Sequence, residues 1–519
     1  IVGRRSSHAG AAMHPSYPII YVRGYAGTQN EVEDTVATPY MGFNLGSTKL
    51  RQHHSGTIES HIFESPLVRL IKEEGYIDAY RDGEALPRGP VAARSIWIFR
   101  YYDITSQDLG QNARKEIEFH AAQLREFIRH IKDATAEDWP AGVPFRVNLV
   151  AHSMGGLVCR CYLQNQAIPG LDGRPATAWT DKAVDKFFTY ATPHGGIEFR
   201  RGLGWVSGFR DFLDINNSAN FGPERMRAFL DLPQDQPLNS VPDRCLPAER
   251  IFCMVGTDAH DYAAAGGLSR RSVGPLSDGL VQIENATVKG AARAFVYRSH
   301  SGHYGIVNSE SSYQNLVRFL FGDIRVEGRL LVDELTLPPA IRRAHAQGDK
   351  IRASYHFETV LRVRGARWDL SRRLVDEHSA IFRSFDDMMR RDRPRHPHLF
   401  TSFLARDRRR NRRRRSLGFS VDLAVRVPDY EVENRFWFDD HYDGGFLFRD
   451  KINLDLTPRD QGSWSLRYGF DSRTPNRATT RITGNEQNGA VVFELPLRSR
   501  TEPGLSARLQ LTCSRWNTG

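Results

Sequence analysis

The sequence is poor in cysteine. Its 519 residues include only five, and none is spaced as the paired C-x-x-C arrangement typical of structural zinc sites. The five are Cys159, Cys161, Cys245, Cys253 and Cys513. They are too few and too unevenly placed for a disulfide framework, so the sequence argues against both a disulfide-stapled fold and a structural metal.

Long apolar runs are also missing. No stretch approaches the roughly 18 uninterrupted apolar residues that cross a bilayer, so we expect no transmembrane helix. The first residues lack the apolar core of a secretory leader, and Met13, just before the first apolar segment, is an alternative start. The missing leader favours a cytoplasmic location.

Positive charge is concentrated toward the C-terminal end. Residues 1–330 hold 36 Lys and Arg against 36 Asp and Glu, whereas residues 331–519 hold 35 against 25. Most of this excess lies in Arg406–Arg415, where eight arginines and Asp407 give a local charge of +7. The uneven distribution predicts two units with different surfaces.

Strand-like and helix-like segments alternate over the first 322 residues. Apolar segments typical of buried strands occupy residues 17–24, 95–102, 145–150, 186–190, 250–255 and 293–297. Helical spacing of apolar residues predicts helices over 108–134 and 155–165. This alternation indicates an α/β fold, with helices on both faces of a mostly parallel sheet.

The remainder of the chain alternates with a period of two. The clearest stretch is 417–425, where every second side chain is large and apolar. The residues expected to point inward are Leu417, Phe419, Val421, Leu423 and Val425. With shorter alternating segments at 435–438 and 463–468, the pattern predicts antiparallel strands and a β-sandwich-like domain.

The strongest chemical signal is Val-Ala-His-Ser-Met-Gly-Gly at residues 150–156, which places Ser153 between a predicted strand and a predicted helix. A serine nucleophile on such a turn needs small residues two positions to either side, because the backbone is strained and crowded. Ala151 and Gly155 are small, although the first position is usually glycine. The alternative is a serine that only caps the helix. The position of Ser153 between a predicted strand and a predicted helix favours the role of nucleophile.

Four motifs in chain order carry a resemblance. They are residues 22–27 (Val-Arg-Gly-Tyr-Ala-Gly), 151–156, 191–196 (Ala-Thr-Pro-His-Gly-Gly), and 277–281 (Ser-Asp-Gly-Leu-Val) paired with 302–306 (Gly-His-Tyr-Gly-Ile). On these motifs, residues 17–322 resemble the α/β-hydrolase superfamily of serine esterases and lipases, in particular the branch of lipases and GPI inositol-deacylase-like proteins. The resemblance implies a catalytic domain over residues 1–322 and an accessory β domain over 323–519. It also favours export over the cytoplasm.

An attacking serine needs a histidine base, and the base needs a carboxylate that orients it. His303 is the favoured base, since its Gly-His-x-Gly loop is similar to that of lipases, and His300 is the alternative. For the acid, Asp278 resembles the lipase position. Asp258, directly after a predicted strand, is its rival, and an ordinary Asp-Gly turn is the structural alternative for Asp278.

The resemblance also places the oxyanion hole, the pair of N–H groups that stabilises the tetrahedral intermediate. Its donors would be the backbone amides of Tyr25 and Met154. Many relatives carry His-Gly where this chain has Arg23-Gly24, which leaves the backbone donor in place but changes the local support. The chemistry needs no cofactor, and we assign no metal ligands.

Two segments outside the motifs are candidates for a function. Residues 197–245 could form a mobile lid, or a buried excursion of the core. Among their aromatics are Phe199, Trp205, Phe209, Phe212 and Phe221. The Arg-rich loop at residues 405–416 reads as a solvated loop, with a peripheral anionic membrane surface as the functional alternative for Arg406–Arg415. The lack of interleaved aromatics argues against nucleic acid.

The sequence thus predicts a lipase or esterase that cleaves carboxylic esters through an acyl-enzyme on Ser153. An ester or lipid is the expected substrate. One alternative is an acyltransferase that uses the same triad. The other is an inactive hydrolase fold that serves as a binding module.

Overall fold

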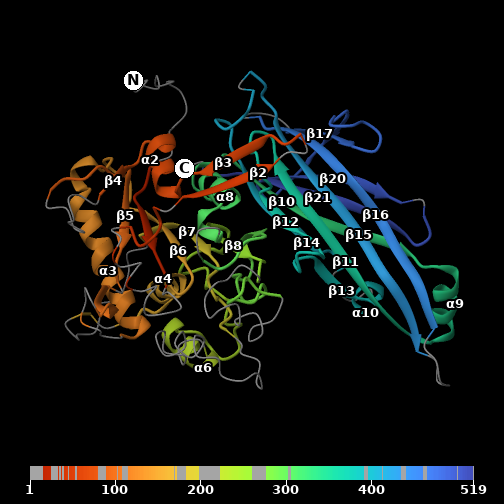
Figure 1. The fold of residues 1–519 in the computed structure, drawn as a ribbon, viewed down its shortest axis with the longest axis horizontal. Coiled ribbons are helices and arrows are strands. Elements are labelled where there is room, and N and C mark those ends of the chain that lie inside the picture. Colours follow the sequence, from red (N-terminus) through yellow and green to blue (C-terminus); the bar gives the residue numbers. More distant parts are fainter. Residues whose placement is uncertain are drawn as a thin grey trace.

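The computed structural model describes residues 16–517 except for a set of internal segments. Those segments are 25–32, 34–36, 38–39, 45, 53–54, 80–88, 102, 108–110, 112–114, 169, 172–182, 198–221, 260–275, 302–304, 391–394, 412, 434–439, 460–463 and 500. Figure 1 shows two bodies side by side, a layered α/β body and an elongated β body.

A parallel sheet of seven strands forms the centre of the α/β body. In spatial order the strands are β4 (Ile77–Asp78), β5 (Ser95–Phe99), β1 (Ile19–Val22), β6 (Val147–His152), β7 (Val184–Tyr190), β8 (Ile251–Gly256) and β9 (Ala292–Val296). β1, β5, β6 and β8 are buried along their whole length, as expected when helices cover both faces of a sheet. The α/β fold predicted from the alternation is confirmed.

Helices lie on either side of this sheet (Figure 1). α3 (Ile117–Ala134) packs beside α4 (Gly155–Gln164), while α2 (Pro66–Glu74) and α8 (Glu310–Phe321) contact one another through ion pairs. The short α6 (Pro223–Leu230) packs on α4. The prediction for α3 began too early, at residue 108, because the buried apolar face of the helix starts only at Ile117.

Two antiparallel sheets build the β body, and one hydrophobic core is shared between them. The first contains β14 (His398–Leu404), β10 (Ile324–Thr336), β21 (Gly504–Arg515), β20 (Ala490–Arg498) and β19 (Asn485–Gln487). The second contains β12 (Ser371–Arg373), β11 (Lys350–Val363), β15 (Leu417–Glu433), β16 (Asp440–Thr457), β17 (Ser465–Phe470) and β18 (Thr480–Thr483), with β13 (Ile381–Ser384) paired to β11. Two helices, α9 (Pro339–Gln347) and α10 (Phe385–Met389), connect strands of this body.

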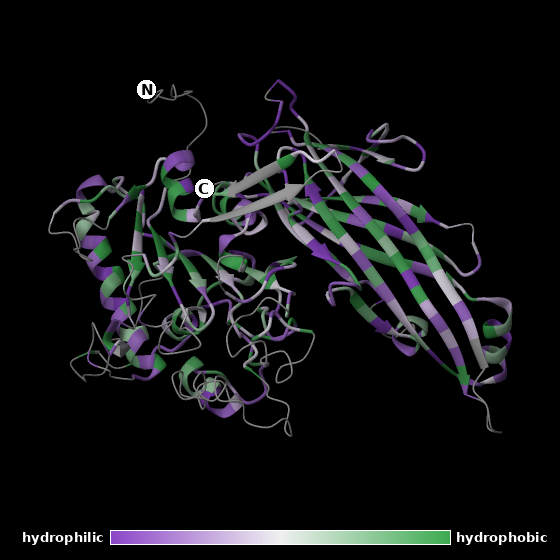
Figure 2. Ribbon diagram, in the orientation of Figure 1, coloured by the Kyte–Doolittle hydropathy of each residue, from purple (hydrophilic) through white to green (hydrophobic). Residues whose placement is uncertain are grey.

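β15 carries the alternation read from the sequence. All five residues predicted to point inward are buried, and Figure 2 shows the resulting bands of hydropathy along the long strands. The strand runs further than expected, to Glu433, because burial continues at Val427, Tyr430 and Val432 after a register shift beside Arg426. The segment predicted at 435–438 lies outside the described residues.

The two bodies meet through aromatic packing around α8. Phe319 of α8 lies 5.2 Å from Phe403 of β14 and 5.7 Å from Trp516, measured between ring centroids. The Trp516 indole N–H donates to the backbone oxygen of Phe319 at 2.8 Å, so the end of the chain caps the helix. Phe403 and Trp516 belong to the core of the α/β body, although the sequence places them in the second unit. The division at residue 322 therefore stays a prediction.

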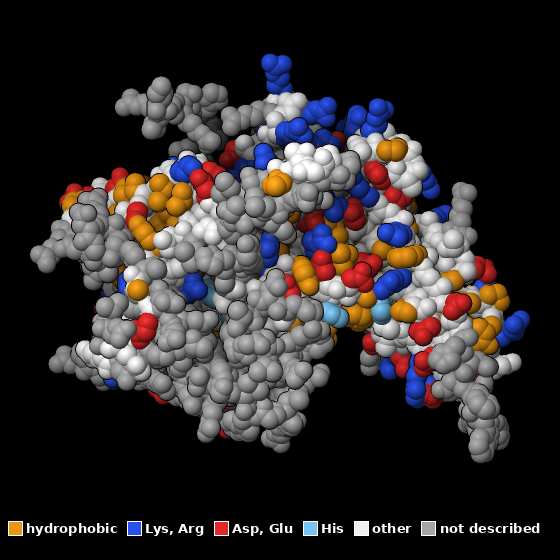
Figure 3. Space-filling view, in the orientation of Figure 1, with side chains coloured by type: hydrophobic (Ala, Val, Ile, Leu, Met, Phe, Trp, Pro, Cys, Tyr) orange, Lys and Arg blue, Asp and Glu red, His pale blue; other side chains and the backbone are white. Residues whose placement is uncertain are grey.

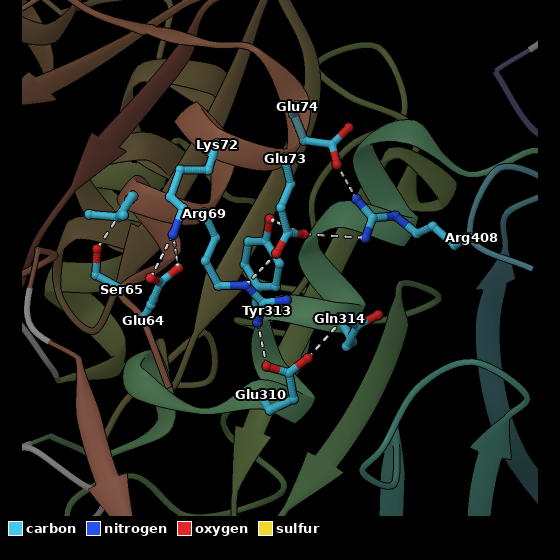
Figure 4. Close-up of polar contacts among 11 residues, drawn as sticks. Glu64, Ser65, Arg69, Lys72, Glu73, Glu74, Glu310, Tyr313, Gln314 and Arg408 are labelled. Carbon is cyan, nitrogen blue, oxygen red and sulfur yellow. Dashed lines mark hydrogen bonds and ion pairs between the residues drawn. The ribbon is translucent and has the colours of Figure 1, made fainter. Parts of the chain in front are cut away.

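A polar network between α2, α8 and the β body also holds this junction (Figure 4). Arg408, from the loop before β15, forms ion pairs with Glu74 and, at 3.7 Å, with Glu73 of α2. Glu73 also accepts hydrogen bonds from Arg69 at 2.8 Å and from the Tyr313 hydroxyl at 3.2 Å. Side chains of α2, α8 and the β body thus share one network. The antiparallel hairpin of β2 (Ser47–Gln52) and β3 (Ile58–Phe63) adds a contact where Phe63 lies 5.6 Å from Trp368.

We expect Trp516→Ala to lower the free energy of unfolding by about 3 kcal/mol, because it removes a large side chain that is 7% exposed and leaves a cavity beside Phe319 and Phe403. Phe382→Ala is the matched control, since that ring on β13 is 41% exposed, and its effect should stay below about 1 kcal/mol. Urea denaturation followed by tryptophan fluorescence and circular dichroism measures both. Equal effects would contradict a junction stabilised by Trp516.

Candidate active site

Ser153 lies at the sharp turn between the end of β6 and the start of α4. Its φ angle is 54°, in the left-handed region that non-glycine residues rarely adopt. The turn is held from both sides, because the Ser153 N–H donates to the Tyr190 oxygen at 2.9 Å and its carbonyl accepts from Gly156 at 3.0 Å. The strained serine turn expected from the motif is present.

Two glycines allow this turn to form. A Cβ atom on Gly24 would lie 2.5 Å from the Ser153 Cβ and 2.6 Å from the Met154 nitrogen, which is closer than real contacts permit. A Cβ on Gly155 would collide with the carbonyl oxygen of Val22. The loop after β1 and the turn after β6 therefore touch backbone to backbone, and Ser153 is fixed between them.

His300, in the loop after β9, hydrogen-bonds to both of the residues predicted around it. Its Nε2 lies 2.9 Å from the Ser153 hydroxyl, and its Nδ1 lies 3.0 Å from Oδ2 of Asp278. All three side chains are at most 4% exposed. His303, the base favoured from the sequence, lies outside the described residues. Its alternative His300, three residues earlier, is the histidine that hydrogen-bonds to Ser153 among the described residues.

The Gly-His-x-Gly context favoured His303, whereas the described residues place its alternative, His300, between Ser153 and Asp278. The loop after β9 turns back early, since the Ile306 N–H donates to the Ser299 oxygen at 3.0 Å, and the His300 N–H donates to the Asp278 oxygen at the same distance. These bonds hold His300 directly beside the acid. Sequence context alone could not reveal at which residue the loop turns.

Asp278 is held by the turn that it begins. Its Oδ1 accepts hydrogen bonds from the backbone N–H groups of Leu280 at 3.1 Å and Val281 at 2.8 Å, which leaves Oδ2 for His300. The Asp-Gly turn, considered as the structural alternative, is therefore present, and it leaves one carboxylate oxygen of Asp278 directed to His300. The rival Asp258 is also buried, and its N–H donates to the Arg298 oxygen at 3.2 Å.

The hydrogen-bond network assigns the protons on His300. An ionised carboxylate only accepts, so Nδ1 carries the proton toward Asp278, and the Nε2 lone pair is left to accept from the Ser153 hydroxyl. His152 supports the arrangement from behind, because its Nε2 donates to the His300 carbonyl at 2.9 Å. Burial, aided by the charges of His300 and Arg23, lowers the pKa of His152 well below its usual range. His152 is thus a neutral hydrogen-bond donor.

A buried arginine that the sequence analysis did not single out braces the site from α4. Arg160 is fully buried and donates to three backbone carbonyls, those of His194 at 2.8 Å, Leu238 at 2.8 Å and Ser240 at 2.7 Å. Burial lowers its pKa to about 9. The Ala-Thr-Pro-His-Gly-Gly motif is thereby tied to the helix that follows the nucleophile. In the sequence, the one feature that could have indicated this role is a charged residue within a mostly apolar helical segment.

Met154, one of the two expected oxyanion donors, lies where the loop after β1 meets the turn after β6. The Met154 N–H finds no acceptor in the part of the chain that the structure describes, and Gly24 lies directly against it. Tyr25, the second expected donor, lies outside the described residues. Arg23, which stands where relatives carry histidine, lies over the Phe43 ring, with its Cζ 5.7 Å from the ring centroid.

The five aromatics named for the expected lid lie outside the described residues. The later part of that segment, from residue 222, is packed rather than open, since Met226, Phe229 and Leu230 of α6 are buried. Arg225 on the same helix pairs with Glu118 at 2.6 Å and with Glu116 at 2.9 Å beside α3. These contacts fit a structural excursion of the core for that part.

No group of three or more His, Cys, Asp or Glu side chains among the described residues could hold a metal ion. No helix among them is long and apolar enough to cross a membrane.

Comparisons with known proteins give one family match and several structural ones. Residues 120–199, which include Ser153, match the family model of lecithin:cholesterol acyltransferase. No curated protein matches the chain in sequence.

Among solved structures, phospholipase PlaB from Legionella pneumophila is 11% identical, with 82% of this chain and 90% of that chain covered at a TM-score of 0.29. Lipase 1 from Pelosinus fermentans is 12% identical, with 59% and 98% covered at a TM-score of 0.23. A gene product from Listeria innocua is 15% identical, with 59% and 94% covered at a TM-score of 0.23.

The parallel sheet, the strained serine turn after β6 and the chain order of Ser153, Asp278 and His300 agree with one another. The chain therefore has the α/β-hydrolase fold, and its residues 120–199 resemble the lecithin:cholesterol acyltransferase family.

Proposed function

We propose that the protein is a serine hydrolase of lipid esters, with Ser153 as nucleophile, His300 as base and Asp278 as the orienting acid. The observation that carries the proposal is the continuous hydrogen-bonded chain from Asp278 through His300 to Ser153, with both links at 3.0 Å or less. An inactive binding module would have no need to keep these three side chains in register. This argues for an enzyme.

In the proposed reaction, the Ser153 oxygen attacks the ester carbonyl while His300 Nε2 takes the hydroxyl proton. Asp278 stabilises the imidazolium that forms, because it is within hydrogen-bond distance of Nδ1 and its own second oxygen is already bound by two amides. His300 then returns the proton to the leaving alcohol. Water repeats the cycle on the acyl-enzyme, activated by the same histidine.

The negative charge of the tetrahedral intermediate would fall beside the N-terminus of α4. A helix N-terminus offers N–H groups and a positive dipole end, which stabilise a developing oxyanion. We assign the backbone N–H groups of Met154 and Tyr25 to this role. The close approach of Gly24 to the Met154 nitrogen supports the assignment, since it brings the residue before Tyr25 to that point.

Acyl transfer is the second candidate. The family that matches residues 120–199 is named for transferring an acyl group, and the same acyl-enzyme serves both outcomes. An alcohol in place of water would complete the transfer. Product analysis by mass spectrometry, with and without added long-chain alcohol or sterol, separates a transferase from a hydrolase.

We also propose a peripheral contact between the β body and an anionic lipid surface through Arg406–Arg415. Seven net positive charges in ten residues support it, because each basic residue near such a surface contributes roughly 1 kcal/mol. A lipid substrate and a lipid-facing accessory body fit the same enzyme.

Ser153→Ala should lower kcat on p-nitrophenyl esters by about 10⁴-fold or more, because no other group replaces the nucleophile. Hydrolysis of a chain-length series from acetate to palmitate measures this and locates the preferred acyl length. Wild-type protein should be labelled at Ser153 by a fluorophosphonate probe, and the variant should not. Labelling of the variant at the same rate would place the nucleophile elsewhere.

Asp278→Asn should lower kcat by about 10³-fold or more, because the amide cannot stabilise the imidazolium as a carboxylate does. Asp258→Asn is the matched control and should leave kcat within about 10-fold of wild type. The histidines form a second pair, in which His300→Ala abolishes turnover and His303→Ala does not. Steady-state kinetics on one soluble ester measures all four. A larger loss in Asp258→Asn or His303→Ala would reverse the assignment.

Gly24→Ala should reduce kcat by about 100-fold or more, since the added methyl group would press on Met154 N, where the oxyanion is expected, and on the Ser153 Cβ. Gly89→Ala is the control, because nothing lies within 4 Å of a Cβ there. Thermal unfolding run beside the kinetics separates a misfolded site from a blocked one. A folded Gly24→Ala protein with full activity would contradict this oxyanion position.

A further inference from the structure

The Arg-rich loop at residues 405–416 forms one wall of a shallow depression of about 850 Å³. The loop joins β14 to β15, and Arg364, in the turn after β11, also lines the depression. Five arginines and one asparagine line the depression, and no carboxylate does. The lining residues are Arg364, Arg409, Arg410, Asn411, Arg413 and Arg414. Figure 2 shows a hydrophilic loop above the sheets, and Figure 3 shows Lys and Arg side chains gathered over the same end of the β body.

The backbone of this loop is held by its own arginines. Arg409 donates through Nε to the Arg406 oxygen at 2.7 Å and through Nη1 to the Arg414 oxygen at 2.5 Å. The Arg406 N–H donates to Asp323 at 2.6 Å, which ties the loop to the residue before β10. These hydrogen bonds fix the backbone of the loop from which the exposed arginine side chains extend.

The turn that carries Arg364 packs against the Arg-rich loop. Gly365 has a φ angle of +106°, and a Cβ there would lie 2.8 Å from the Arg408 oxygen. The turn after β11 therefore packs directly on the backbone of the Arg-rich loop. Arg408 itself points away from the depression, to Glu73 and Glu74 of α2, and so anchors the loop to the α/β body (Figure 4).

Positive charge in the depression is poorly compensated. Arg364 lies 3.6 Å from Asp455, but Arg410, Arg413 and Arg414 are exposed and form no ion pair with any carboxylate in the described part of the chain. Like charges that are gathered without counter-charges repel one another, and a bound anion removes that repulsion. The planar guanidinium fork binds phosphate oxygens in pairs, which an ammonium group cannot do.

We propose that this depression is a binding site for a phosphate-bearing anion, with Arg410, Arg413 and Arg414 as its principal ligands and Arg364 as a further lining residue. Its volume exceeds that of one phosphate group and leaves room for the rest of a headgroup. No aromatic side chain lines it, so it lacks the stacking surface that single-stranded nucleic acid uses. The site deepens the proposed membrane contact, and in this respect it rests on the proposed function.

The test uses Ser153→Ala protein, so that no lipid is hydrolysed during the measurement. Sedimentation with phosphatidylcholine vesicles, with and without phosphatidic acid, tests a lipid source of the phosphate, and calorimetry with inorganic phosphate tests a soluble one. We expect the protein to bind vesicles that contain phosphatidic acid and not vesicles of phosphatidylcholine alone. Binding of inorganic phosphate that the arginine substitutions abolish would also support the site, with a soluble ligand. Absence of binding in both arms would overturn it.

Arg410→Ala, Arg413→Ala and Arg414→Ala together should weaken vesicle binding about 100-fold, since each basic residue contributes about a factor of five. The matched control removes three exposed arginines around β17 and β18, by Arg467→Ala, Arg477→Ala and Arg481→Ala, and should change binding less than about 3-fold. Equal losses in the two triple variants would reduce the effect to net charge and overturn a built site. So would an Arg-to-Lys triple at 410, 413 and 414 that binds as well as the parent. Tighter binding of single-stranded RNA than of vesicles would overturn it too.

Ester hydrolysis by enzyme that retains Ser153 distinguishes failure of the proposed hydrolase function from failure of the proposed anion site. The Arg410, Arg413 and Arg414 triple substitution, made in the wild-type enzyme, should leave kcat on a soluble ester within about 2-fold, because these side chains lie outside the triad. A wild-type enzyme that hydrolyses no ester but binds vesicles would sink the proposed function and leave the anion site standing. A hydrolase that binds neither phosphate nor vesicles would do the reverse.

Discussion

The candidate site depends on the backbone contact between the loop after β1 and the turn after β6. Because Gly24 and Gly155 have no side chains, the two segments approach within distances that no Cβ would permit. That approach supports the left-handed conformation of Ser153 and fixes its hydroxyl 2.9 Å from His300. The strained conformation costs about 1–3 kcal/mol, which the surrounding parallel sheet must offset.

The β body contributes side chains to the core and to the ion pairs of the α/β body. Its Phe403 and Trp516 complete the core of the α/β body around α8, and its Arg408 shares the carboxylates of α2. α8 itself follows the His300 loop in the chain. The loop that anchors the two bodies through Arg408 also carries the exposed Arg410, Arg413 and Arg414.

Much of the fold and part of the site were accessible from the sequence. Continuous apolar runs predicted β1, β5 and β6, because strands covered on both faces must be apolar throughout. The small residues around Ser153 predicted its turn, because crowding there is local in the chain. The position of Asp278 was also accessible, since an Asp followed by Gly begins a turn that orients its own carboxylate.

The sequence by itself determined the strands, the serine turn and the alternation of β15, since each follows from neighbouring residues and from burial. Only the tertiary structure decided that His300 lies beside Ser153, that Arg160 donates to the His194 carbonyl in the motif after β7, and that Arg364 lines the same depression as the Arg-rich loop. These choices depend on contacts between segments up to 147 residues apart. Hydrogen-bond geometry at such separations is set by how loops close over the sheet, and no local pattern encodes it.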